Sequence, residues 1–98
     1  MVGVYKVLIA DDKEYEREYL HKFITSKYPH DLRVVCTAQD GEEALRQLYE
    51  LKPDLLLLDI IMPKLDGLEI AQQAKKAFPQ VVIVMISAYA EFDYVKEA

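Results

Sequence analysis

Residues 55–67 read LLLLDIIMPKLDG, and this segment gives the clearest indication of the architecture. Four leucines lead directly into a carboxylate, and a short unbroken apolar run of this kind is typical of a strand buried on both faces of a parallel sheet. The strand is expected to end at Asp59, at the carboxyl edge of the sheet, where open α/β sheets bind their ligands. Pro63 and Gly67 predict a loop, and Asp66 is a suitable N-cap for a helix that follows it.

The composition of the 98-residue chain is that of one small globular domain. Its hydrophobic fraction of 52% is sufficient for a core, and the net charge of -5 argues against direct contact with a nucleic-acid backbone. No apolar run is long enough to cross a bilayer, and the first residues do not resemble a signal peptide. The single cysteine, Cys36, excludes an internal disulfide and suits a reducing cytosol. We therefore expect a cytoplasmic protein without membrane contact.

Strand-like and helix-like segments alternate along the whole chain. We expect strands at residues 4–10, 32–37, 55–59 and 81–86, and helices at 13–27, from 40 onward, at 67–78 and from 92 onward. The apolar residues expected to form the packing face of the first helix are Tyr15, Tyr19, Leu20, Phe23 and Ile24; those of the third are Leu68, Ile70, Ala71 and Ala74. This alternation requires parallel strands with right-handed crossovers and helices on both faces, within one α/β domain that spans residues 1–98.

Polar side chains follow three of the expected strands. Asp11 and Asp12 come after the first strand, Asp59 ends the third, and Ser87 and Ala88 come after the fourth. The carboxyl ends of parallel strands share one edge, so the three carboxylates converge if the first and third strands are neighbours. Two carboxylates about 6 Å apart repel by about 3 kcal/mol at an effective dielectric of about 20, so the group needs a cation or raised pKa values.

A hard divalent ion with oxygen ligands removes this conflict, and Mg²⁺ is the usual intracellular choice. Such a site handles phosphate, and a carboxylate within it can act as a nucleophile and become an acyl phosphate. Ser87 is a candidate hydrogen-bond donor to a phosphoryl oxygen, and the small Ala88 would leave the approach open.

Each of these residues also has a simpler explanation when it is taken alone. An Asp-Asp pair or a single Asp at a strand end is more often a cap than a metal site, and a single Ser signals little. The set at three strand ends is harder to explain by capping. The residues expected to be solvent-exposed on the first helix or in the turn after it are Glu14, Glu16, Arg17, Glu18, His21 and His30.

With these motifs the sequence resembles the receiver domain of bacterial two-component response regulators. The resemblance is carried by VLIADD at residues 7–12, DGEEAL at 40–45, PDLLLLD at 53–59 and IVMISA at 83–88. The family's D-x-x-M-P-x-x-x-G segment is matched at Asp59, Met62, Pro63 and Gly67. The resemblance covers essentially all 98 residues, and the combination of motifs is specific.

The resemblance implies a function for several residues. Asp59 would accept a phosphoryl group from the phosphohistidine of a sensor histidine kinase. Asp12, Asp59 and the backbone carbonyl of Ile61 would hold Mg²⁺, with Asp11 contributing directly or through water. Ser87 would move toward the phosphoryl group and bias an interaction face.

The resemblance also implies a flavodoxin-like, doubly wound parallel sheet. The family's order is 2-1-3-4-5, and here we expect 2-1-3-4, because the fifth strand with its lysine and the fifth helix are missing. The domain would then be incomplete at its C-terminus, with an exposed apolar edge at residues 81–86 and impaired phosphoryl transfer. A homodimer is possible. The motifs most resemble regulators with an AraC-type output, so DNA would be bound only through a region absent from this chain.

Three other readings remain open. A Mg²⁺-dependent phosphatase with an Asp nucleophile would carry a second Asp two residues after the first, where this chain has Ile61. A nucleotide-binding domain would carry a glycine-rich phosphate loop, and neither the G-x-G-x-x-G nor the G-x-x-x-x-G-K-[ST] motif occurs here. A degenerate receiver could serve as a protein-interaction module, although the intact acidic set argues against degeneracy.

Overall fold

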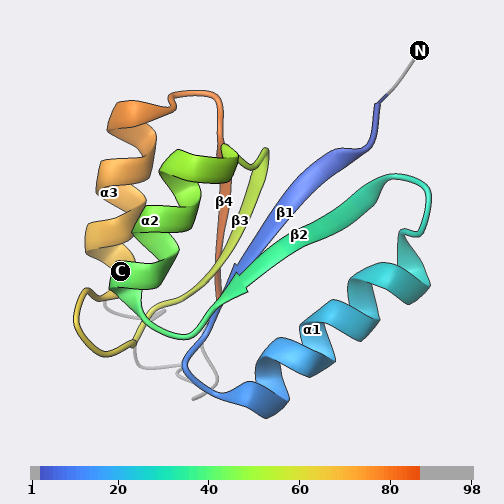
Figure 1. The fold of residues 1–98 in the computed structure, drawn as a ribbon, viewed down its shortest axis with the longest axis horizontal. Helices are drawn as coiled ribbons and strands as arrows, with labels where there is room; N and C mark the ends of the chain where they lie inside the picture. Colours follow the sequence, from blue (N-terminus) through green and yellow to red (C-terminus); the bar gives the residue numbers. More distant parts are fainter. Residues whose placement is uncertain (1–2, 87–98) are drawn as a thin grey trace, which may run out of the picture.

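The computed structural model describes residues 3–86, which form a parallel sheet with the strand order β2-β1-β3-β4 (Figure 1). The elements are β1 (Tyr5–Ala10), α1 (Glu14–Lys27), β2 (Leu32–Ala38), α2 (Gly41–Leu51), β3 (Leu55–Asp59), α3 (Gly67–Ala77) and β4 (Val82–Ile86). The predicted strand order is confirmed, and each described element begins within one residue of its expected start. The ends agree equally well for every described element except α2, for which only a start was predicted. The helix expected from residue 92 lies outside the described residues. No helix within residues 3–86 is long and apolar enough to cross a membrane.

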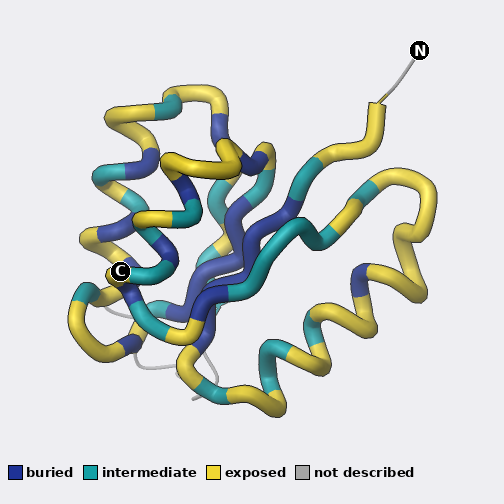
Figure 2. The backbone as a smooth tube through the Cα atoms, in the orientation of Figure 1, coloured by how far each residue is buried: buried dark blue, intermediate teal, exposed yellow. Residues whose placement is uncertain are grey.

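The two central strands are buried on both faces, with α1 on one side of the sheet and α2 and α3 on the other (Figures 1 and 2). In β1, Leu8 and Ala10 pack with α2 and α3, whereas Val7 and Ile9 pack with Ile24 of α1. Side chains alternate between the two faces of a strand, so an unbroken apolar run supplies both cores at once. This explains why β1 and β3 occupy the centre of the sheet.

The β4 strand forms one edge of the described sheet. Val82 and Val84 are 56% and 43% exposed, while Met85 and Ile86 are half-buried against the two cores. The apolar edge expected at this strand is therefore present in the described part of the chain.

The predicted packing face of α1 is wrong for its aromatic residues. Tyr15 and Tyr19 are about two-thirds exposed and Phe23 is also exposed, whereas Ile24 is buried and Leu20 is half-buried. Tyr19 stacks on Phe23 with 6.4 Å between ring centroids, so these rings pack on one another along the outside of the helix. The stripe of α1 that packs against the sheet is therefore narrower than the stripe of apolar residues in its sequence.

Three further expectations about helix faces are wrong. Glu16 and Arg17, expected in solvent, are half-buried, because they lie on the same side of α1 as Ile24. Arg17 Nη1 donates to the backbone carbonyl of Asp11 at 2.9 Å, so its side chain links α1 to the end of β1. Leu68, expected to pack inward, is 58% exposed in the first turn of α3.

The loop between β3 and α3 is held by two glycines. The Gly67 N–H donates to the Ile60 carbonyl at 2.9 Å, and the Gly41 N–H donates to the Pro63 carbonyl at 3.3 Å. A Cβ on Gly67 would collide with the Asp59 carbonyl oxygen, and one on Gly41 would collide with the backbone of Leu65. Both positions therefore need glycine, since backbone approaches backbone there.

Aspartates cap the two helices that begin at these glycines. Asp40 accepts the Glu43 N–H, and Asp66 accepts the Glu69 N–H, each at 2.9 Å. The predicted capping by Asp66 is confirmed.

The close approach at Gly67 predicts a strong effect of one methyl group. Gly67→Ala should lower the free energy of unfolding by about 2 kcal/mol, because the β3–α3 loop must move away from the added carbon. Urea unfolding followed by circular dichroism measures this change. Gly3→Ala is the matched control, since its Cβ would meet nothing within 4 Å, and it should change stability by less than about 0.5 kcal/mol. Equal effects of the two substitutions would contradict the prediction.

Candidate functional site

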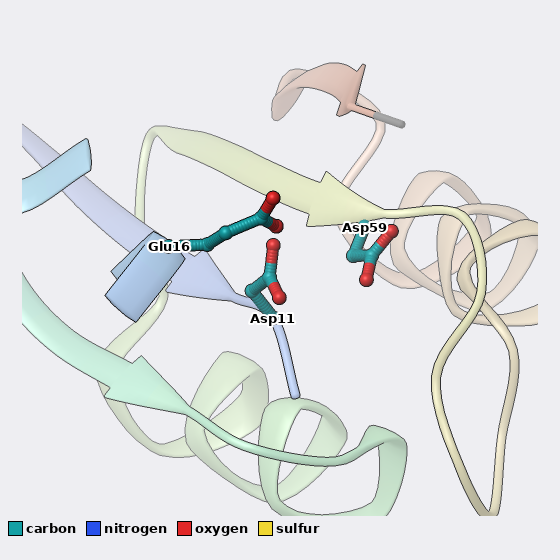
Figure 3. Close-up of side chains that lie close together, drawn as sticks. All are labelled: Asp11, Glu16 and Asp59. Atoms are coloured by element: carbon teal, nitrogen blue, oxygen red, sulfur yellow. The ribbon is translucent and has the colours of Figure 1, made fainter. Parts of the chain in front are cut away.

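Strand register brings two buried carboxylates together at the carboxyl edge of the sheet. Ala10 of β1 is paired with Leu58 of β3, so the residues that follow them, Asp11 and Asp59, lie side by side (Figure 3). Their exposed fractions are 1% and 4%. The predicted convergence of the first and third strand ends is therefore present in the structure.

Each of these aspartates uses one oxygen locally and leaves the other without a hydrogen bond. Asp11 Oδ1 accepts the N–H of Lys13 at 3.0 Å, and Asp59 Oδ1 accepts the N–H of Ile61 at 3.3 Å. The Oδ2 atoms of both aspartates are buried and have no hydrogen-bond partner among the described residues. The capping explanation thus accounts for one oxygen of each carboxylate, and the second oxygen needs another reason, because unsatisfied buried polar atoms are costly.

Glu16 adds a third carboxylate that the sequence reading missed. One oxygen each from Asp11, Glu16 and Asp59 lie within 4.8 Å of one another (Figure 3). Contrary to the expectation that Glu16 faces solvent, its spacing of four from Leu20 and of eight from Ile24 places it on the inward stripe of α1. That spacing is the sequence signal for its position, although the neighbouring tyrosines form a more conspicuous stripe.

Asp12 and Lys13 lie at the rim of this cluster. Lys13 Nζ is 3.0 Å from Asp12 Oδ1, 3.6 Å from Asp59 Oδ2 and 3.8 Å from Asp11 Oδ1. Asp12 is exposed and does not belong to the group of oxygens that lie within 4.8 Å of one another. Its hydrogen bond to Lys13, with the nearby aspartate charges, raises the pKa of the Lys13 ammonium.

Burial makes the charged forms of the two central aspartates unfavourable. Desolvation is the main cause that raises the pKa of Asp11 from 3.8 to about 6, and the adjacent Glu16 carboxylate adds to it. Desolvation followed by the Asp11 charge raises the pKa of Asp59. Hard oxygen donors with two unpartnered buried atoms fit a hard divalent cation such as Mg²⁺, which would favour the ionised carboxylates.

The other predicted site residues position the loop after β3. Ile61 is exposed, with its N–H at the Asp59 carboxylate, and Met62 is buried in the core beneath α2 and α3. Pro63 and Gly67 take part in the backbone hydrogen bonds of the loop. Ser87 and Ala88 lie outside the described residues, directly after β4, whose Ile86 pairs with Asp59.

The raised pKa of Asp11 predicts a pH-dependent stability in metal-free buffer. The folded state binds this proton more tightly than the unfolded chain, so the stabilisation is complete below about pH 4 and is lost as the pH rises through about 6. Asp11→Asn keeps an acceptor for the Lys13 N–H but carries no charge. It should raise the free energy of unfolding at pH 7.5 by about 3 kcal/mol, with a gain that shrinks toward pH 4.

Urea unfolding in EDTA across this pH range measures the effect. Asp31→Asn, in the exposed turn before β2, is the control with the same chemical change. Identical pH profiles for the two variants would show that burial of Asp11 does not carry the effect.

Comparison with known proteins places this geometry in a family. Residues 7–98 match the response regulator receiver domain. The response regulator protein VraR of Staphylococcus saprophyticus is 37% identical over 93 residues, which are 95% of this chain and 44% of that protein. The chain thus spans less than half the length of the curated relatives it matches.

Solved structures show the same fold. The receiver (REC) domain of AraT, a response regulator from Geobacillus stearothermophilus, superposes with a TM-score of 0.85 at 38% identity, covering 97% of this chain and 73% of that one. The CheX–CheY–BeF3–Mg²⁺ complex from Borrelia burgdorferi gives a TM-score of 0.82 at 30% identity, covering 97% and 75%. By family match, sequence identity and fold, this chain belongs to the receiver domains of response regulators.

Proposed function

We propose that Asp59 is the phosphoryl acceptor of this receiver domain. The observation that carries the proposal is its carboxylate at the end of β3, where Oδ1 is held by the Ile61 N–H and Oδ2 has no hydrogen-bond partner among the described residues. One oxygen is thereby oriented while the other keeps its lone pairs for attack on phosphorus. A carboxylate oxygen without a hydrogen bond, on an otherwise fixed side chain, is a suitable nucleophile.

The proposed donor is the phosphohistidine of a sensor histidine kinase. Asp59 forms a new P–O bond, the P–N bond of the phosphohistidine breaks, and its electron pair returns to the imidazole nitrogen, which takes up a proton. The product is an acyl phosphate on Asp59. With a small donor such as acetyl phosphate, the P–O bond to acetate breaks instead and acetate leaves.

Asp11, Asp12, Asp59 and the backbone carbonyl of Ile61 are the residues proposed to hold Mg²⁺. The unpartnered Asp11 Oδ2 and the raised pKa values of Asp11 and Asp59 support this assignment. The Mg²⁺ in the similar CheY complex is consistent with it. The ion would supply positive charge against the carboxylates and the incoming phosphoryl oxygens. The chain's own contribution is to hold the carboxylates together before the donor arrives.

The phosphorylated domain is proposed to act as a switch and not as an enzyme. The phosphoryl group adds about -1.5 to -2 charge at one sheet edge, and Ser87 is the proposed donor to it. Coupling between sites is typically about 1–3 kcal/mol, sufficient to shift the population of an interaction face. The output would lie outside this chain. DNA binding by an AraC-type region, a homodimer and a cytoplasmic location remain predictions.

The phosphoryl-acceptor proposal predicts the outcome of a mass measurement. The folded chain, incubated with Mg²⁺ and acetyl phosphate, should gain the mass of one phosphoryl group, and Asp59→Asn should gain none. Asp31→Asn, an exposed aspartate away from the strand ends, should be modified like the wild type. Modification of Asp59→Asn to the same extent as the wild type would contradict the assignment. A folded wild-type chain that binds Mg²⁺ and gains no phosphoryl group would keep the metal site without the transfer chemistry.

The metal proposal predicts a loss of affinity when Asp11 is neutralised. Asp11→Asn should weaken Mg²⁺ binding at least about tenfold in isothermal titration calorimetry, because one buried carboxylate oxygen is replaced by an amide. Asp31→Asn should bind like the wild type. Equal affinities in all three proteins would place the metal elsewhere.

A further inference from the structure

Lys13 is the residue that connects all three aspartates of the site. Its Nζ lies 3.0, 3.6 and 3.8 Å from carboxylate oxygens of Asp12, Asp59 and Asp11, respectively. Among the described residues, no other basic side chain forms an ion pair with any of them. Lys13 therefore brings a positive charge to the place where the carboxylates repel one another.

The backbone of Lys13 is fixed at this place. Its N–H donates to Asp11 Oδ1 at 3.0 Å, and its carbonyl accepts the N–H groups of Glu16 and Arg17, each at 3.1 Å, at the start of α1. The side chain is about one-quarter exposed, so it lies at the rim of the site. Its ammonium points inward, as the distances to the three carboxylates show. A lysine has a flexible four-carbon stem, so the ammonium can leave the carboxylates without any change in the backbone.

We propose that Lys13 is a built-in counter-cation that competes with the divalent metal for the aspartates and so sets the metal affinity of the site. The inference rests on the proposed function, because it needs these aspartates to be the metal ligands. A divalent metal bound to these carboxylates would lie close to the ammonium that contacts them, and the two cations repel at short range. Metal binding and the Lys13 ion pairs therefore oppose one another.

The alternative is that Lys13 supports the metal site by keeping the aspartates in place. The two roles predict effects of opposite sign. If Lys13 competes, removal of its charge strengthens metal binding; if it supports the site, removal of its charge weakens binding. The direction of the change in affinity distinguishes them.

The experiment is Mg²⁺ titration of the whole chain by isothermal calorimetry. Lys13→Gln should bind Mg²⁺ about five- to tenfold more tightly than the wild type, at the low end of typical coupling between sites because the ammonium is partly hydrated. Lys13→Arg keeps the charge and should stay close to the wild type. Lys22→Gln makes the same charge change nine residues further along α1, on its exposed face, and should alter the affinity by less than about twofold because solvent screens it.

Thermal unfolding supplies a second readout. In EDTA, Lys13→Gln should melt at a lower temperature than the wild type, because the repulsion among the aspartates is no longer offset. Saturating Mg²⁺ should then raise its melting temperature by more than it raises that of the wild type, since tighter binding to the folded state stabilises it more.

The outcomes separate this inference from the proposed function. If the wild type binds Mg²⁺ and Lys13→Gln binds it equally or more weakly, Lys13 does not compete and the inference alone is overturned. If Lys22→Gln gains as much affinity as Lys13→Gln, net charge explains the effect and the inference is also overturned. If the wild type binds no Mg²⁺ at all, the inference and the proposed metal site both fail.

Discussion

The pairing of β1 with β3 is the constraint on which the site depends. Ala10 and Leu58 are partners in the parallel ladder, so the next residue of each strand carries its carboxylate to the same point at the sheet edge. The sheet cannot shift to relieve the repulsion between Asp11 and Asp59, because a slip of one residue would move the side chains of one strand to the opposite face and disrupt the packing of both cores. The two hydrophobic cores therefore hold the charges together.

This arrangement costs stability that the rest of the fold supplies. A rise in the pKa of Asp11 from 3.8 to about 6 corresponds to about 3 kcal/mol against its charged form, a large fraction of the 5–15 kcal/mol typical of a domain. Lys13 offsets part of the repulsion through its three ion pairs. Protonation or a bound cation relieves such electrostatic stress.

Packing determines the position of the loop that follows β3 and runs beside Asp59. Gly67 brings the start of α3 against the end of β3, and Gly41 lets the same loop rest on the start of α2. Met62 anchors the loop in the core between these contacts. The residues of the D-x-x-M-P-x-x-x-G segment that follow Asp59 thus act on the site by fixing the path of the chain beside it.

Sequence patterns predicted parallel strands that end on one edge of the sheet, and the resemblance to receiver domains supplied the strand order that places Asp11 beside Asp59. Continuous apolar runs mark strands buried on both faces, and parallel strands must end on one edge. The packing face of α1 could not be predicted from the sequence. Tyr15, Tyr19 and Phe23 suggest a wide apolar stripe, but the helix contacts the sheet mainly through Leu20 and Ile24. Because α1 packs through these two residues, Glu16 lies in the acidic cluster. Lys13, directly before the helix, lies where its ammonium reaches three aspartates. Periodicity identifies the residues that can share a face, but the rotation of a helix against its sheet depends on how both surfaces pack, and this rotation determines which charges surround Asp59.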